Sequence, residues 1–111
     1  CIRDRNKVNF ISINNFQHDS VLSLLNKFIS NKKYIYLSID VDVLDLSSSG
    51  NPEALGLTIK DILSILKSLG NNLRERTAMF DIVEYNPLID YSKVTGILVN
   101  KMIMELSCML K

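Results

Sequence analysis

YIYLSIDVDVLD, residues 34–45, is the stretch on which the fold of this chain depends. Its first half is apolar, β-branched and aromatic, which is typical of a strand buried on both faces in a parallel sheet. Its second half holds three carboxylates, Asp40, Asp42 and Asp45, with no Lys or Arg between them. If the strand continues this far, the side chains of Asp40 and Asp42 leave from the same face.

Two carboxylates held this close repel each other. Keeping both charged while they are partly buried costs several kcal/mol unless a cation compensates. A divalent metal is the simplest such cation, because carboxylate oxygens are hard ligands that suit Mg²⁺, Mn²⁺ or Ca²⁺. In the alternative interpretation, one aspartate caps a turn and the other faces water. The spacing fits both a metal site at Asp40 and Asp42 and this alternative.

The composition limits the partners of the chain. Its 111 residues make one small domain or part of a larger one, and a 47% apolar share is enough for a hydrophobic core. Thirteen basic and twelve acidic residues nearly cancel, and no basic stripe predicts nucleic-acid binding. The apolar patterns are too short to span a membrane. Cys1 and Cys108 lie at opposite ends, which favours free thiols in a reducing, cytoplasmic compartment.

Hydrophobic periodicity predicts the order β-α-β-α-β-α. Because strands alternate with helices, we expect a parallel sheet with helices on both faces, a three-layer α/β/α fold. Three strands are few for such a sheet, and the chain begins with Cys1 rather than Met. We therefore expect residues 1–111 to be the C-terminal part of one larger α/β domain. The expected elements are strand Val8–Ile13, helix Gln17–Ser30, the strand at 34–45, helix Thr58–Leu69 ended by Gly70, strand Thr77–Glu84 and helix Ser92–Leu110.

The last two helices carry further local signals. Thr58 followed by Asp61 resembles a capping box, which predicts a helix start. Apolar residues of the final helix are expected to face inward: Val94, Ile97, Leu98, Met102, Ile103, Leu106 and Met109.

Acidic residues follow two of the expected strands. Asp40 and Asp42 end one strand and Glu84 ends the other, so in a parallel sheet all three reach the same edge. A metal held by the aspartates can activate a water molecule near neutral pH. Glu84 can then accept hydrogen bonds from a cationic amidine or guanidine group, although it can equally point into solvent. Asp45 and Asp81 are expected to tie down loops or neighbouring groups, and His18 to be solvated or to cap a helix.

Several motifs resemble one known family. Residues 38–45, SIDVDVLD, resemble the Ser-x-Asp-x-Asp-x-x-Asp-Pro signature of the ureohydrolases, the family of arginase, agmatinase and formimidoylglutamase. Residues 81–87, DIVEYNP, resemble its Asp-x-x-Glu-x-Asn-Pro segment. Between them, Pro52-Glu53 and Gly56-Leu57-Thr58 fall in the family's order. The resemblance covers residues 34–110.

The resemblance implies an arginase-like three-layer α/β fold with a binuclear Mn²⁺ centre that hydrolyses guanidino or formimidoyl groups. It implies that Asp40 and Asp42 are the last two metal ligands. It also implies that Glu84 and Asn51 border a small amidine or guanidine substrate. Members of the family are usually trimers or hexamers, so the resemblance implies a homo-oligomer.

Within the family, one feature favours formimidoylglutamase, which releases formamide from N-formimidoyl-L-glutamate in histidine metabolism. This feature is the run Asn86-Pro87-Leu88-Ile89-Asp90 followed by Thr95. The alternative is an arginase or agmatinase that releases urea from a guanidino substrate. Two departures from the family pattern bear on substrate choice: Leu46 replaces the usual Pro, and the loop between Asp45 and Pro52 is short.

The family's histidine ligands and its Asp-x-His-x-Asp block have no counterpart in these residues. We therefore expect the isolated chain to bind Mn²⁺ weakly and not to turn over substrate. Two other functions remain open. The pair Asp40 and Asp42 also fits the nucleophile motif of haloacid-dehalogenase-type phosphatases. The chain could instead be a non-catalytic remnant or pseudoenzyme.

Overall fold

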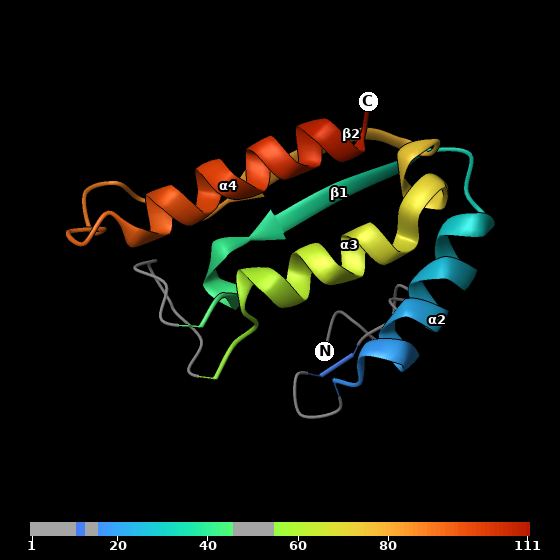
Figure 1. Cartoon of the computed structure of the whole chain (residues 1–111), viewed down its shortest axis with the longest axis horizontal. Helices are drawn as coiled ribbons and strands as arrows, with labels where there is room; N and C mark the ends of the chain where they lie inside the picture. The colour runs from blue at the N-terminus through green and yellow to red at the C-terminus, as the bar shows by residue number, and fades with distance from the viewer. Residues whose placement is uncertain (1–10, 13–15, 46–54) are drawn as a thin grey trace, which may run out of the picture.

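The computed structural model describes residues 11–12, 16–45 and 55–111. Its elements are α2 (His18–Ser30), β1 (Ile35–Asp40), the 3₁₀ helix η2 (Val41–Val43), α3 (Ile59–Arg74), β2 (Thr77–Val83) and α4 (Val94–Met109). β1 and β2 pair in parallel, and α3 connects them along the chain (Figure 1). These described elements confirm the predicted α/β class and its parallel sheet. The first expected strand, Val8–Ile13, falls largely outside the described residues.

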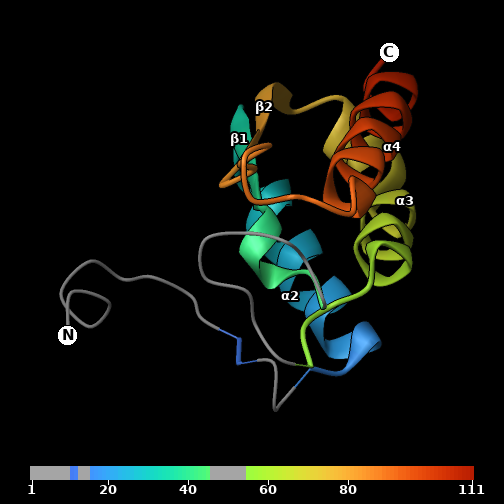
Figure 2. The same cartoon turned by 90° about the vertical axis from the view of Figure 1, so that its left-hand side faces the viewer.

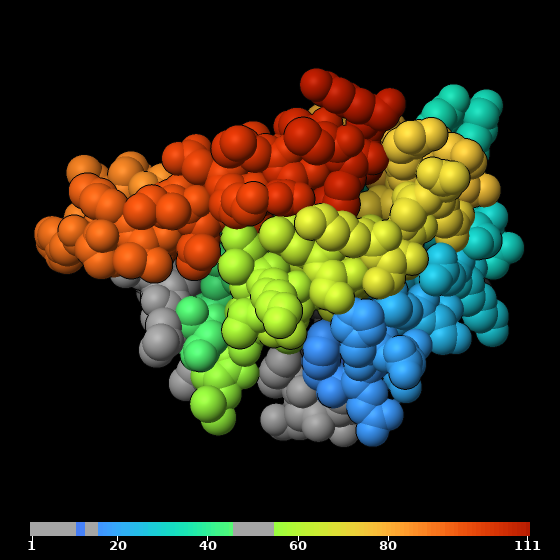
Figure 3. Space-filling model, viewed as in Figure 1, coloured from blue at the N-terminus to red at the C-terminus, as the bar shows by residue number. Residues whose placement is uncertain are grey.

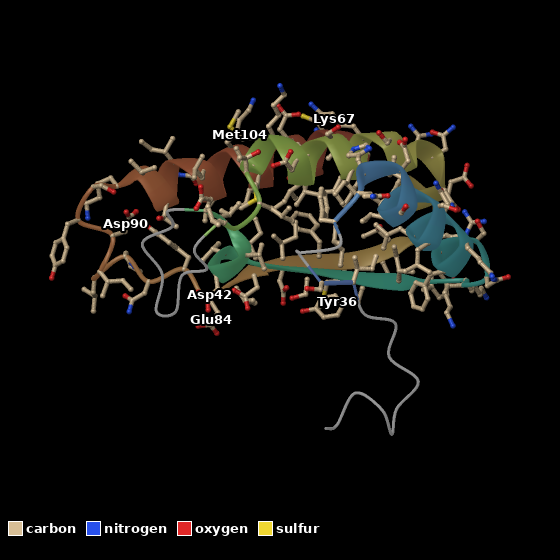
Figure 4. All side chains as sticks on the ribbon, turned by 90° about the horizontal axis from the view of Figure 1, so that it is seen from below. Tyr36, Asp42, Lys67, Glu84, Asp90 and Met104 are labelled. Atoms are coloured by element: carbon tan, nitrogen blue, oxygen red, sulfur yellow. The ribbon has the colours of Figure 1, made fainter. Side chains whose placement is uncertain are left out.

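The helices lie on one face of the described sheet. Figure 2 shows the strands on one side and α3 and α4 on the other, and Figure 4 shows α2 on that same side. In the space-filling view of Figure 3, the three helices lie side by side and hide most of both strands. The opposite face leaves Tyr36 and Met79 exposed by 55% and 60%. The described residues therefore supply two of the three expected layers.

The hydrophobic core fills the space between this helical layer and the sheet. Alternate residues of β1 face it, with Ile39 buried and Tyr36 and Ser38 exposed. Each well-buried Leu, Ile or Met side chain contributes about 1.5–3 kcal/mol to folding. The buried apolar residues are Val21, Ile29, Ile39, Val41, Leu44, Ile62, Ile65, Leu66, Leu69, Leu73, Val99, Met102 and Leu106.

α3 begins with the capping box that the sequence predicts. The Asp61 carboxylate accepts hydrogen bonds from the Thr58 amide and hydroxyl, and the Asp61 amide donates to the Thr58 hydroxyl. These bonds from Thr58 hold the pKa of Asp61 below its usual value. The expected break at Gly70 is confirmed, but a further helical turn that the sequence did not predict follows it. The backbone breaks there, at φ 50° and ψ −131°, but helix resumes to Arg74 because Leu73, which is 2% exposed, anchors the extra turn in the core.

The inner face of α4 is predicted in part: Met102 and Leu106 are buried, and Leu98 and Met109 pack against the core, as expected. Val94, Ile97 and Ile103 were expected inside, yet their side chains are 50%, 65% and 42% exposed. The prediction fails for these three residues because apolar side chains occur on several sides of this helix, so no single stripe defines its inner face. Its buried positions are Thr95, Val99, Met102 and Leu106. Neither α4 nor any other helix in the described chain is long and apolar enough to cross a membrane.

Candidate functional site

The two aspartates of the first motif lie on different elements. β1 ends at Asp40, and η2 begins directly after it, so Asp42 lies on a 3₁₀ turn and the strand geometry does not persist. Oδ1 of Asp40 accepts a hydrogen bond from the Asp42 amide at 2.8 Å, which caps this turn. Val41 and Leu44 are 0% and 1% exposed and anchor the turn in the core. The capping role left open for one aspartate therefore belongs to Asp40.

Asp42 has a buried oxygen that nothing in the described chain satisfies. Its Oδ1 is shielded from solvent and accepts no hydrogen bond from the described residues. A buried carboxylate oxygen in this state is costly, because it loses its hydration without a replacement. A cation removes that cost, and carboxylate oxygens are suitable ligands for hard divalent metals. The chemistry of this oxygen therefore fits a hard divalent cation such as Mg²⁺, Mn²⁺ or Ca²⁺.

Glu84 lies at the same edge of the sheet. The parallel register pairs Asp40 with Val83, so Glu84 follows β2 just beyond the level at which β1 ends. Figure 4 shows Asp42 and Glu84 together at this end of the strands. Glu84 is exposed, and its φ of 64° is in the left-handed region that residues other than glycine rarely adopt. The expected common edge is confirmed, while Asn51 lies outside the described residues.

The segment after Asp42 is tied to the chain just before α3. The Leu57 amide donates to the Val43 carbonyl at 2.8 Å, and the Asp45 amide donates to the Leu57 carbonyl at 3.0 Å. The Asp45 carboxylate also accepts a hydrogen bond from the Leu55 amide at 3.2 Å. Asp45 therefore holds this loop, as the sequence predicts, and the paired backbones fix the position of Asp42.

Asp81 joins the two strands on the open face of the sheet. It pairs with Ser38 in the register and accepts a hydrogen bond from the Tyr36 hydroxyl. This bond raises the pKa of Tyr36 and lowers that of Asp81. The other carboxylate oxygen of Asp81, Oδ1, is buried and accepts no hydrogen bond from the described residues. The sequence offered no signal for this cross-strand bond, because it depends on the register.

His18, the single histidine of the chain, takes part in a helix–helix contact. Its Nε2 lies 3.2 Å from the Ser64 hydroxyl of α3, so it does not cap α2 as one expectation held. Within the described residues, no three His, Cys, Asp or Glu side chains gather closely enough to hold a metal ion.

Comparison with known proteins places these acidic motifs in a family context. A family model described as the arginase family matches residues 2–109. The chain belongs to the arginase family. A mitochondrial arginase from Medicago truncatula is 39% identical over 79 residues, which are 68% of this chain and 22% of that protein. A formimidoylglutamase from Vibrio vulnificus is 32% identical over 82 residues, or 71% of this chain and 24% of the relative.

A solved member of the arginase family supports the fold. The crystal structure of Helicobacter pylori arginase superposes on 99% of this chain with a TM-score of 0.84, at 20% sequence identity. The matched residues are 38% of that structure. This chain therefore spans less than half of the relatives that it matches, and it shares the arginase-like fold over nearly all its length.

We predict that Gly56→Ala disturbs the edge that carries Asp42. A Cβ at Gly56 would overlap the carbonyl oxygen of Val43 and lie 2.9 Å from the Asp45 nitrogen. Because these are backbone atoms that cannot rotate away, we expect a loss of about 1–3 kcal/mol in the free energy of unfolding. Urea unfolding of the full-length protein and of its Gly56→Ala variant measures this loss.

The neighbouring Leu55→Ala is the matched control. The Leu55 side chain is 85% exposed and φ is 61°, so the change removes little packing and keeps a Cβ at a left-handed position. Its effect should stay within about 0.5 kcal/mol. Equal losses for the two variants would contradict the proposed crowding at Gly56.

Proposed function

We propose that this chain is the C-terminal part of a Mn²⁺-dependent hydrolase that acts on a formimidoyl or guanidino group. The observation that carries the proposal is the unsatisfied buried oxygen of Asp42 at the sheet edge that it shares with Glu84. An acid pair at the carboxyl end of β1 is suited to a cation, and a third acid beside it is suited to a cationic substrate. Membership of the arginase family supports both assignments.

In this proposal Asp40 and Asp42 are two ligands of a binuclear manganese centre. Other ligands come from outside the described residues, since these residues contain no group of three candidate ligands. Bound manganese would supply the Lewis acidity that makes a water molecule nucleophilic near neutral pH. Asp40 also accepts a hydrogen bond from the Asp42 amide, so one proposed ligand, Asp40, fixes the turn that carries the other, Asp42.

Glu84 is proposed to bind the substrate. Its carboxylate can accept two hydrogen bonds from an amidinium or guanidinium group, which fixes the orientation of the carbon that is attacked. Exposure at the edge leaves this carboxylate accessible to such a group. Asn51 is proposed to border the same substrate.

The proposed substrate is N-formimidoyl-L-glutamate, which yields L-glutamate and formamide. The motif that favours it runs from Asn86 to Asp90 and is followed by Thr95. In the structure these side chains act within their own loop: Asn86 Oδ1 accepts the Leu88 amide at 3.0 Å, and Asp90 is buried. The motif therefore supports the substrate through resemblance rather than through contact. Arginine or agmatine, with release of urea, is the alternative.

We also propose that the complete protein is cytoplasmic and forms a homo-oligomer, a trimer or a hexamer. The family resemblance supports the oligomer. The near-balance of acidic and basic residues favours neither nucleic acid nor an anionic membrane surface as a partner.

We predict that Asp42→Asn weakens Mn²⁺ binding by at least about tenfold, because an amide oxygen carries no charge to offset that of the metal. Isothermal titration of Mn²⁺ into the metal-free protein, as its gene encodes it, measures this change. Asp19→Asn is the control, because the Asp19 side chain is fully exposed on α2. Unchanged Mn²⁺ affinity in the Asp42 variant would remove Asp42 from the ligand set.

We predict that Glu84→Gln lowers kcat/KM about ten- to hundredfold, since a charge-assisted hydrogen bond becomes a neutral one. Mn²⁺ affinity should not change, because Glu84 is assigned to the substrate. The assay compares formimidoylglutamate, arginine and agmatine with Mn²⁺, so it also tests the substrate choice. No hydrolysis of any of the three by the unaltered protein would contradict the proposed function.

A further inference from the structure

Asp90 is a buried charge outside the proposed ligand and substrate residues. It lies in the loop between β2 and α4, and its side chain is 0% exposed. Its Oδ2 accepts the Gly96 amide at 2.8 Å, and its Oδ1 accepts the Ser92 hydroxyl at 3.2 Å. The Thr95 amide adds another hydrogen bond. A carboxylate without solvent is stable only with such donors, and here the chain supplies them.

Two of these donors are amides in the first turn of α4. Helix N-termini leave amides without intrahelical partners and favour negative charge. Lys93, directly before the helix, is left-handed at φ 62° and makes no side-chain cap, so Asp90 caps α4 from further back in the loop. Burial by itself raises the pKa of Asp90, but these hydrogen bonds and the charge of Lys93 outweigh it and lower the pKa.

The same helical turn also holds the beginning of the loop. Tyr85 is half-buried against the core, and its hydroxyl lies over Gly96. A Cβ on Gly96 would lie 2.5 Å from Oη of Tyr85 and 3.5 Å from Oδ2 of Asp90. Glycine at this position therefore lets the Tyr85 ring and the Asp90 carboxylate meet the helix together. As a result, residues 85–90 are fixed at both ends on one turn of α4.

Glu84 depends on this attachment for its position. It precedes Tyr85 directly and has the left-handed backbone described above, a conformation that persists only when its surroundings impose it. Figure 4 shows Asp90, at the approach to α4, and Glu84 at the same end of the molecule. Displacement of the loop from α4 would therefore move the Glu84 backbone.

We infer that Asp90 is a positioning residue: its buried carboxylate clamps the loop of residues 85–93 onto the first turn of α4, and this clamp holds Glu84 where it meets the substrate. The clamp itself stands on the contacts with Gly96, Ser92 and Tyr85. Its consequence for substrate binding rests on the proposed function.

The test compares Asp90→Asn with Asp61→Asn in the protein as its gene encodes it. Both changes convert a helix-capping carboxylate into an amide, but Asp61 caps α3 through hydrogen bonds with Thr58, whereas Asp90 caps α4. We expect Asp90→Asn to speed amide hydrogen exchange in a peptide covering residues 84–96 roughly tenfold, and Asp61→Asn to leave that peptide unchanged. We also expect KM to rise about tenfold in the Asp90 variant, with kcat within about twofold and unchanged Mn²⁺ affinity.

A second pair of variants covers the case in which Asp90→Asn does not fold. Gly96→Ala should speed exchange in the same peptide, because its Cβ meets the Tyr85 hydroxyl. Adding Tyr85→Phe removes that oxygen and should restore much of the protection. The clamp is overturned if exchange over residues 84–96 is unaffected by Asp90→Asn and by Gly96→Ala.

The two levels of the inference fail in different ways. Faster exchange with an unchanged KM would keep the clamp and overturn its role in positioning Glu84. An inactive unaltered protein would overturn the proposed function and the substrate role together, while the exchange data would still decide whether Asp90 holds the loop.

Discussion

The parallel pairing of β1 with β2 is the constraint on which the candidate site depends. Parallel strands bring their carboxyl ends to one edge, so Asp40 and Glu84, far apart in sequence, reach the same level of the sheet. α3 makes this pairing possible because it returns the chain to the opposite end of the sheet before β2 begins. An antiparallel pairing of the same two strands would place the two acids at opposite ends.

Two buried acidic groups at this end of the fold show opposite ways of meeting the cost of burial. Asp90 is surrounded by donors from its own loop and from α4, so its charge is satisfied inside the chain. Oδ1 of Asp42 has no such donor among the described residues, although it lies in an ordered turn. Acids of the first kind stabilise a structure, whereas acids of the second kind stay costly until a ligand arrives. Oδ1 of Asp81 also lacks a donor among the described residues, so Asp42 is the candidate ligand because its unsatisfied oxygen lies in the turn directly after β1.

Sequence reasoning was most successful where the signal is local. The capping box at Thr58 and Asp61, the strands and the acids at their ends follow from short-range patterns, and the structure agrees with them. It failed where the answer depends on packing. The inner face of α4 was predicted only in part, because apolar side chains occur on several sides of the helix. The bond between Tyr36 and Asp81 exists only through the strand register.

The alternation of apolar and other residues along β1 indicates which face of the strand is buried. Apolar residues at Ile35, Leu37 and Ile39 alternate with Tyr36, Ser38 and Asp40, a pattern typical of a strand that buries one face more fully than the other. The described helices cover that more fully buried face, and the second helical layer of the expected three-layer fold is not among the described residues. The turn at Val41–Val43 had no clear sequence signal, because β-branched residues there favour a continued strand.

The two crowded glycines limit how this part of the chain can diverge over evolution. A Cβ on Gly56 would meet backbone atoms of Val43 and Asp45, which cannot move aside. A Cβ on Gly96 would meet the Tyr85 hydroxyl, so a side chain there requires the Tyr85 ring to shift. Substitution of either glycine is therefore restricted, whereas substitutions at the exposed residues of α4 should be tolerated. Descendants of this sequence that keep the fold should therefore retain Gly56 and Gly96 longer than the candidate site residues Asp42 and Glu84.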